Sequence, residues 1–395
     1  MRRTLIIAGV AIVIIGIVSY GVWALTRPAT EAAPNAPQKS FFERLFPFGA
    51  PAAPATTPGG VTSGTPVGTA DRTVPRLRQV SDQPAAGAAV WKVGATSTIR
   101  YVERATGHIY ETPAASPTAV RVSNTTIPGI EQVLWSNPHD FILRYLSAAD
   151  AVQNFHVTLV PTSTEQALQG AFIGPFDRGV VDLGNLVTVT EGASGATVAI
   201  GKPGASMRTL LTSPLNSWAP LITSVATYLA TLPGSGVPGS LYRIAGGAFV
   251  PIISSVPGLV ALPSPTGKYV AYSAGSHNAL QLSVIDTKTG TIYTSPLATI
   301  ASKCVWVSES TPTLACGIPE SLPTGDYPTD WLTGSVSLTD DIWEIEPVSG
   351  KTTLLSNPGK EAGASLDVWQ PMTDGGYITF INKQDLTPWS FRIAL

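Results

Sequence analysis

The pattern of apolar and polar positions divides the chain into three parts. Leu5–Leu25 is an uncharged apolar run that, as a helix rising about 1.5 Å per residue, spans a hydrocarbon core of roughly 30 Å. Residues 28–75 keep no apolar period of 2 or 3.6. Residues 76–395 alternate short β-rich runs with turns rich in Gly and Pro. We therefore predict a cytoplasmic stub and transmembrane helix (1–27), a Pro/Ala/Thr-rich linker (28–75) and an all-β domain (76–395).

Apolar strand positions, often occupied by Trp, recur along the all-β part. They include Trp135, Trp218, Leu262 and Trp306; the last three are 44 residues apart, and the first interval of 83 residues is close to two such units. A period in the low forties with four strands per unit is typical of a β-propeller blade. The repeat therefore predicts a β-propeller.

The number of blades and the closure of the ring follow from where the units begin and end. Counting from the strand at residues 88–91 predicts seven blades, or six if residues 166–213 do not form a complete blade. The last unit ends at Leu395 without a fourth strand. Because an open ring would leave unpaired edge strands, we expect Arg76–Val80 to supply the missing strand.

Three segments share an acidic residue followed by two variable positions, Thr or Ser, and Gly. They are Glu103–Gly107, Asp286–Gly290 and Glu346–Gly350. This spacing predicts hairpins with a type I turn, in which the carboxylate accepts backbone N–H groups and the Gly takes the left-handed conformation. We interpret these acids as turn formers.

These residues carry a family resemblance. Ser264–Lys268, of sequence Ser-Pro-Thr-Gly-Lys, and the hairpin Asp286–Gly290 resemble the TolB-type and WD40-like propeller repeats, and Trp369–Tyr377 resembles them more loosely. Arg100–Tyr110 is similar to a segment of membrane-anchored bacterial propellers that have no assigned activity. The resemblance implies a propeller fold and no particular reaction.

The step from Trp306 to Trp369 is 63 residues, so about 19 residues are inserted in one unit, and we place them between Pro319 and Asp340. Exposed aromatic side chains on a rigid scaffold are frequent recognition elements. Trp331 either folds back over the edge of its blade or contacts a partner protein or a glycan. The binding residues proposed in this insertion are Asp326, Tyr327, Asp330 and Trp331.

Cys304 and Cys316 lie in a predicted hairpin whose turn is at residues 309–312. Symmetric pairing about this turn would place the two sulfur atoms opposite each other, so the pair forms a disulfide or remains as two buried thiols. The four His residues show no metal-ligand spacing, and P-loop, EF-hand and nucleophile-elbow motifs are absent from the sequence. Asp340 and Asp341 are only a weak signal for a cation site. We expect no metal and no cofactor, and no catalytic residue is indicated.

The N-terminal run indicates a membrane anchor and its orientation. Arg2 and Arg3 precede the run, and Tyr20 and Trp23 lie near its far end. The positive-inside rule then places the N-terminus in the cytoplasm and the rest of the chain outside the cell membrane as a single-pass protein. The alternative is a cleaved secretory signal, whose apolar region is usually shorter, about 7–15 residues.

The predicted linker has one apolar island, residues 40–48. It either forms a turn on the membrane interface or the domain surface, or it is a docking motif for a partner protein. Its apolar side chains include Phe41, Phe42, Phe46 and Phe48.

The charge composition narrows the function classes. Lys and Arg number 24 against 26 Asp and Glu, and only 13% of residues are charged. With no excess of basic residues, a nucleic-acid partner is excluded. We predict a non-enzymatic binding or scaffold protein of the cell envelope. The alternative is an envelope hydrolase or lyase whose polar residues converge on the propeller channel; a signalling role is disfavoured by the very short N-terminal stub.

Overall fold

The computed structural model describes residues 74–147, 151–161 and 166–393. The chain divides into two compact units, Met1–Thr65 and Pro66–Leu395. The predicted transmembrane run and the Phe-rich island at 40–48 lie outside the described residues. Within the described ranges, no helix is long and apolar enough to cross a membrane.

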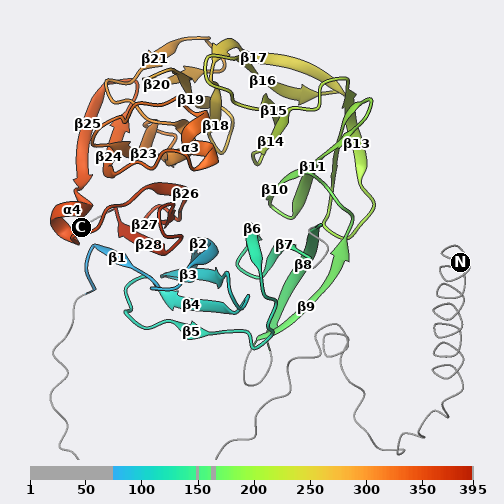
Figure 1. The fold of residues 1–395 in the computed structure, drawn as a ribbon, viewed down its shortest axis with the longest axis vertical. Helices are drawn as coiled ribbons and strands as arrows, with labels where there is room; N and C mark the ends of the chain where they lie inside the picture. The colour runs from blue at the N-terminus through green and yellow to red at the C-terminus, as the bar shows by residue number, and fades with distance from the viewer. Residues whose placement is uncertain (1–73, 148–150, 162–165, 394–395) are drawn as a thin grey trace, which may run out of the picture. The chain divides into compact units, whose positions relative to one another are not determined.

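Seven four-stranded antiparallel sheets form a ring of blades (Figure 1). The seven-bladed propeller predicted from the repeat is therefore confirmed. The six-bladed alternative is wrong, because residues 166–213 supply the last strand of one blade and all four strands of the next.

The first three blades follow the chain order from the inner to the outer strand. Blade 1 contains β2 (Ala85–Val93), β3 (Thr96–Glu103), β4 (Ile109–Pro113) and β5 (Val120–Arg121). Blade 2 contains β6 (Ile130–Asn137), β7 (Asp140–Leu146), β8 (Val152–Pro161) and β9 (Gln166–Ile173). Blade 3 contains β10 (Arg178–Asp182), β11 (Asn185–Gly192), β12 (Gly195–Gly201) and β13 (Arg208–Ser213).

The next three blades keep the same order. Blade 4 contains β14 (Trp218–Ile222), β15 (Thr227–Thr231), β16 (Pro238–Ala245) and β17 (Ala248–Pro257). Blade 5 contains β18 (Val260–Pro263), β19 (Tyr269–Ser276), β20 (Ala279–Asp286) and β21 (Ile292–Thr294). Blade 6 contains β22 (Cys304–Ser308), β23 (Thr313–Pro319), β24 (Asp340–Glu346) and β25 (Lys351–Ser356).

Blade 7 joins the two ends of the propeller. It contains β26 (Val368–Thr373), β27 (Tyr377–Asn382), β28 (Pro388–Arg392) and, as its outer strand, β1 (Leu77–Gln79). Leu77 lies opposite Phe391 in this antiparallel pair and is buried. The predicted closure of the ring by the segment at 76–80 is confirmed.

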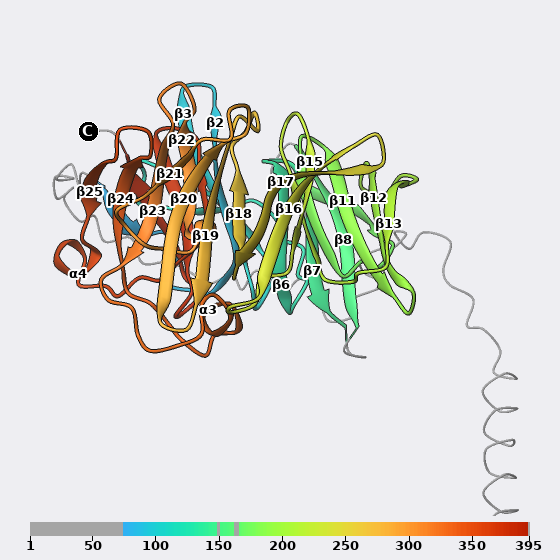
Figure 2. The ribbon, with the colours of Figure 1, turned by 90° about the horizontal axis from the view of Figure 1, so that it is seen from above.

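Three short helical segments lie between strands: η1 (Ala301–Lys303) before β22, α3 (Thr329–Thr333) between β23 and β24, and α4 (Pro358–Glu361) before β26. The predicted insertion is thus the connection that contains α3. Figure 2 shows α3 at one end of the ring. We call this the insertion end; it also holds the turns between the second and third strands and the links between blades. The opposite end, which holds the turns joining first to second and third to fourth strands, is called the groove end.

The hydrophobic core is a series of layers between neighbouring blades. One layer joins Val187 and Val198 of blade 3 to Trp218 and Leu229 of blade 4, and similar layers join the later blades. Because each sheet is covered on both faces, inner strands read as apolar runs instead of a strict alternation. This explains much of the low charge of the sequence.

The predicted turns form as expected at the backbone. Gly107, Gly290 and Gly350 take φ values of +70°, +74° and +73°. The carboxylate of Asp286 accepts hydrogen bonds from two backbone N–H groups, at 2.9 and 3.0 Å. The longer side chains of Glu103 and Glu346 instead bind the Thr or Ser hydroxyl of their own turn, so only the Asp turn uses the predicted carboxylate contact.

Candidate functional site

The insertion buries the two aromatic residues that were predicted to lie on an exposed loop. Tyr327 and Trp331 are both 0% exposed and pack with Ile300 and Leu338. The predicted exposure of these two side chains is therefore wrong: α3 turns its indole inward, because burial of a Trp side chain is favourable. The side chain of Trp331 therefore folds back onto the propeller. The role of Tyr327 and Trp331 in binding a partner stays a prediction.

The insertion is fastened to the turns of three neighbouring blades. Thr329 Oγ1 accepts a hydrogen bond from Ser235 N of blade 4 at 2.9 Å, and Gly325 N donates to Asn278 Oδ1 of blade 5 at 2.8 Å. On the other side, Lys383 Nζ of blade 7 donates to the backbone oxygen of Trp331 at 2.6 Å. The segment therefore links blades 4 to 7 at the insertion end.

The two acids of the insertion have different surroundings. Asp326 is exposed and its Oδ1 lies 2.9 Å from His277 Nδ1. Asp330 is half-buried, and its Oδ2 accepts the backbone N–H of Asp326 at 2.8 Å, so it stabilises the start of α3. Of the four proposed binding residues here, only Asp326 has an exposed side chain.

Beneath α3 lies a cluster of buried charges that sequence reasoning did not find. Lys303 Nζ lies 2.8 Å from Asp340 Oδ2 and also pairs with Asp367, and all three side chains are 0% exposed. Asp367 further accepts Trp331 Nε1 at 2.9 Å and Leu338 N at 3.0 Å. The cluster thus ties η1, β24, the start of β26 and the insertion together.

The electrostatics of this cluster are dominated by burial. Two carboxylates share one ammonium group, and Oδ1 of Asp340 has no hydrogen-bond partner among the described residues. Loss of solvent raises the pKa of Asp340 to about 6, although Lys303 acts in the opposite direction. The adjacent Asp341 is bound instead to Asn357 Nδ2 at 2.7 Å, so the two neighbouring acids do not form one cation site. With no exposed atoms, the cluster holds structure and has no access to a substrate in this conformation.

Cys304 and Cys316 are directly opposite in the pairing of β22 with β23, and the structure joins their sulfur atoms in a disulfide. The cross-link lies in the apolar layer between blades 5 and 6. Within the residues that the structure describes, no group of three or more His, Cys, Asp or Glu side chains is placed to hold a metal ion.

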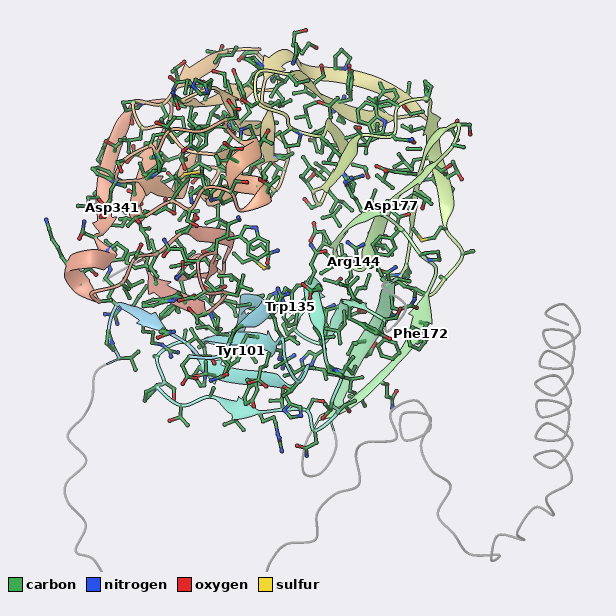
Figure 3. The ribbon with its side chains drawn as sticks, in the orientation of Figure 1. Tyr101, Trp135, Arg144, Phe172, Asp177 and Asp341 are labelled. Carbon is green, nitrogen blue, oxygen red and sulfur yellow. A yellow bond between two sulfur atoms is a disulfide. The ribbon has the colours of Figure 1, made fainter. Side chains whose placement is uncertain are left out.

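Arg144 lies on β7, the second strand of blade 2. Its guanidinium donates to Asn154 Oδ1 at 3.0 Å and to the backbone oxygens of Phe176 and Asp177 at 3.2 and 3.1 Å. Figure 3 shows Arg144 and Asp177 in this region, with Trp135 nearer the centre of the ring. These contacts make Arg144 a bridge between blades 2 and 3, not a free group for catalysis.

A groove of about 580 Å³ opens between blades 3 and 4 at the groove end. Its lining mixes apolar side chains with hydroxyl, amide and backbone groups of the turns, and more of its exposed surface is polar than apolar. The only charged side chain that lines it is Arg208. Its lining includes Asn185, Arg208, Ile222, Ser224, Val225 and Gly247. A concave site of this size, into which several polar groups converge, is a candidate for binding.

The groove lies in a part of the chain that has no acidic residue. Between Glu191 and Asp286 the sequence contains neither Asp nor Glu. Among the ion pairs of the described residues, none involves Lys202, Arg208 or Arg243. The acid-free stretch can be read from the sequence, although the sequence analysis did not use it. The groove cannot be read from the sequence, because turns of two different blades form it.

Comparison with known proteins supports the fold. No protein-family model matches the chain, and no curated protein matches its sequence. An oligogalacturonate lyase in complex with manganese is similar in structure, with a TM-score of 0.53, 9% identity and coverage of 82% of this chain and 94% of the lyase. YCF48 from Cyanidioschyzon merolae has a TM-score of 0.50 and 8% identity, covering 80% of this chain and 99% of its own. At these identities the likeness shows a β-propeller alone, and the TolB-type resemblance stays a prediction.

Proposed function

We propose that this chain is a membrane-anchored, extracytoplasmic binding protein whose propeller presents the groove between blades 3 and 4 to a protein or glycan of the cell envelope. The observation that carries the proposal is the groove itself, a concave site of about 580 Å³ with a predominantly polar exposed lining and an Arg208 that forms no ion pair among the described residues. Its walls belong to hydrogen-bonded sheets of a closed ring, so the site is held in shape before a partner binds. The predicted membrane anchor supports the location.

No reaction is proposed. The similarity to a lyase concerns the fold, and propellers host unrelated functions. The polar clusters found at Lys303 and Arg144 are buried or saturated with protein contacts. Binding is therefore the function that the geometry supports best.

The test is crosslinking and affinity capture of the full chain from its native membrane. Asn185→Trp fills the groove, whereas Val348→Trp places the same side chain at an exposed turn of blade 6 at the same end of the ring. We expect the wild type and Val348→Trp to capture the same envelope protein or glycan and Asn185→Trp to lose it. Capture of nothing above background by the wild type, or equal capture by both variants, would count against the proposal.

A further inference from the structure

The groove end of blades 3 and 4 carries an excess of unpaired positive charge. Lys202, Arg208 and Arg243 are exposed and lie in or near the turns at this end. The acidic residue of blade 3 at this end is Asp182. Its side chain is half-buried, and burial raises its pKa. The next acid of blade 3, Glu191, lies at the insertion end, where it pairs with Arg178.

The turns of blades 5 and 6 at this end are balanced in charge. Lys351 pairs with Glu346 in blade 6, and Lys268 of blade 5 lies in the field of Asp286 and Glu309. The cations of blades 5 and 6 at this end are therefore matched by acids, whereas those of blades 3 and 4 are not.

Apolar side chains project from neighbouring turns at the same end of blades 3 and 4. Leu183, in the turn between β10 and β11, is 68% exposed, and Val225, in the turn between β14 and β15, is 64% exposed. Met207 adjoins Arg208 and is also exposed. Basic residues interleaved with exposed apolar tips are typical of surfaces that insert shallowly into the headgroup region of a bilayer.

The described chain joins the ring at this end as well. Leu77 pairs with Phe391 near the end of β28, so the residues before β1 lead into blade 7 from the groove end. Blade 7 lies across the ring from blades 3 and 4 (Figure 1).

We propose that the groove end of blades 3 and 4 rests on an anionic bilayer surface, with Lys202, Arg208 and Arg243 near lipid phosphates and the tips Leu183 and Val225 among the headgroups. A bilayer satisfies these features together, because a plane meets the tips of several turns at once, whereas a small ligand occupies only the groove. The inference restricts the proposed function, because a groove end that rests on a bilayer leaves the groove open only to a partner that lies at that bilayer surface.

The test is cosedimentation of the ring with vesicles. Residues 66–395 form one compact unit in which the ring closes through β1, so this fragment is used without the N-terminal segment. The vesicles are phosphatidylcholine alone or with 30% phosphatidylglycerol, a probe composition of about one anionic lipid in three. We expect binding to the anionic vesicles that weakens as salt is raised, and little binding to the neutral ones.

Two matched double variants locate the contact. Arg208→Gln/Val225→Ser changes one cation and one apolar tip at the groove end; Lys360→Gln/Val237→Ser changes the same two features at the insertion end. We expect the first to lower vesicle affinity about ten-fold or more, since one cation alone accounts for about five-fold, and the second to leave it unchanged. Circular dichroism and thermal unfolding establish that both variants remain folded.

Absence of binding to anionic vesicles, equal binding to neutral vesicles, or equal effects of the two double variants would overturn the inference. The proposed function would survive that result if Asn185→Trp still abolished capture of an envelope partner. Conversely, vesicle binding without any captured partner would leave the lipid contact standing and remove the proposed function.

Discussion

Replacing Lys303 by Met should destabilise the propeller strongly. Met keeps a similar length and removes the ammonium group that lies between Asp340 and Asp367. Both carboxylates are 0% exposed, so neither gains water when its partner is lost. Breaking a buried ion pair in this way costs about 3–5 kcal/mol, a large part of the roughly 5–15 kcal/mol that holds a typical domain folded.

The same contacts explain where the damage should spread. Asp367 accepts N–H groups of Trp331 and Leu338, and Asp340 accepts Val368 N at 2.7 Å. Without Lys303, the buried carboxylate of Asp367 loses its charged partner, and any rearrangement of this side chain disturbs the insertion above it. The indole of Trp331, which also lies 4.8 Å from Lys303 Nζ, should therefore report the change.

The assay is urea unfolding of residues 66–395 at pH 7, followed by tryptophan fluorescence. The control is Lys351→Met, which breaks an exposed pair with Glu346 and should shift the midpoint little. Adding Asp340→Asn to Lys303→Met removes one buried charge while keeping an acceptor for Val368 N, and should recover part of the loss. A shift for Lys303→Met no larger than that for Lys351→Met would refute the reasoning.

Three further predictions concern other parts of the ring. Because burial raises the pKa of Asp340 to about 6, the folded state holds the proton of this carboxyl more tightly than the unfolded chain does. The contribution of Asp340 to the free energy of unfolding therefore falls as the pH rises from about 4 to about 6. Asp340→Asn should flatten that part of a profile of urea midpoint against pH. Gly267→Ala should lower the free energy of unfolding in urea by about 1–3 kcal/mol, because φ is +68° and the new Cβ would lie 2.2 Å from the phenol oxygen of Tyr228. The control is Gly290→Ala, which should cost less, because φ is similar at +74° but no atom lies within 4 Å of the new Cβ. Cys304→Ser and Cys316→Ser should each lower stability by about 3 kcal/mol and the double variant by no more, and additive losses in thermal unfolding would contradict a disulfide.

The sequence predicts the ring well because each blade repeats one local pattern. Trp135, Trp218, Trp306 and Trp369 all lie on the innermost strand of their blade, so their spacing reports the blade period directly. The repeat is weak over residues 166–213, where the inner strand of blade 3, β10, carries no Trp, so the sequence left both six and seven blades open. There the pairing of β10 to β13 decides the number.

The candidate site is predicted less well, because it depends on contacts between blades. Nothing near Trp331 in sequence indicates that its indole meets Asp367, which is 36 residues away and is brought under α3 only when the ring closes. Lys303 is 64 residues from the same carboxylate. A side chain in a predicted loop is expected to be exposed. This expectation fails where polar groups that are distant in sequence supply hydrogen-bond partners for the side chain inside the protein.

The two ends of the ring have different physical roles that depend on each other. At the insertion end, Ser235, Asn278 and Lys383 hold the inserted segment across blades 4 to 7, and Lys303 is sealed below it. Blade 7 is in turn closed by β1, so blades 3 and 4 cannot move apart without breaking a blade layer, the insertion contacts or the closing strand pair. The groove and its cationic turns therefore stay in one arrangement, and the entropy of ordering them is lost during folding rather than during binding.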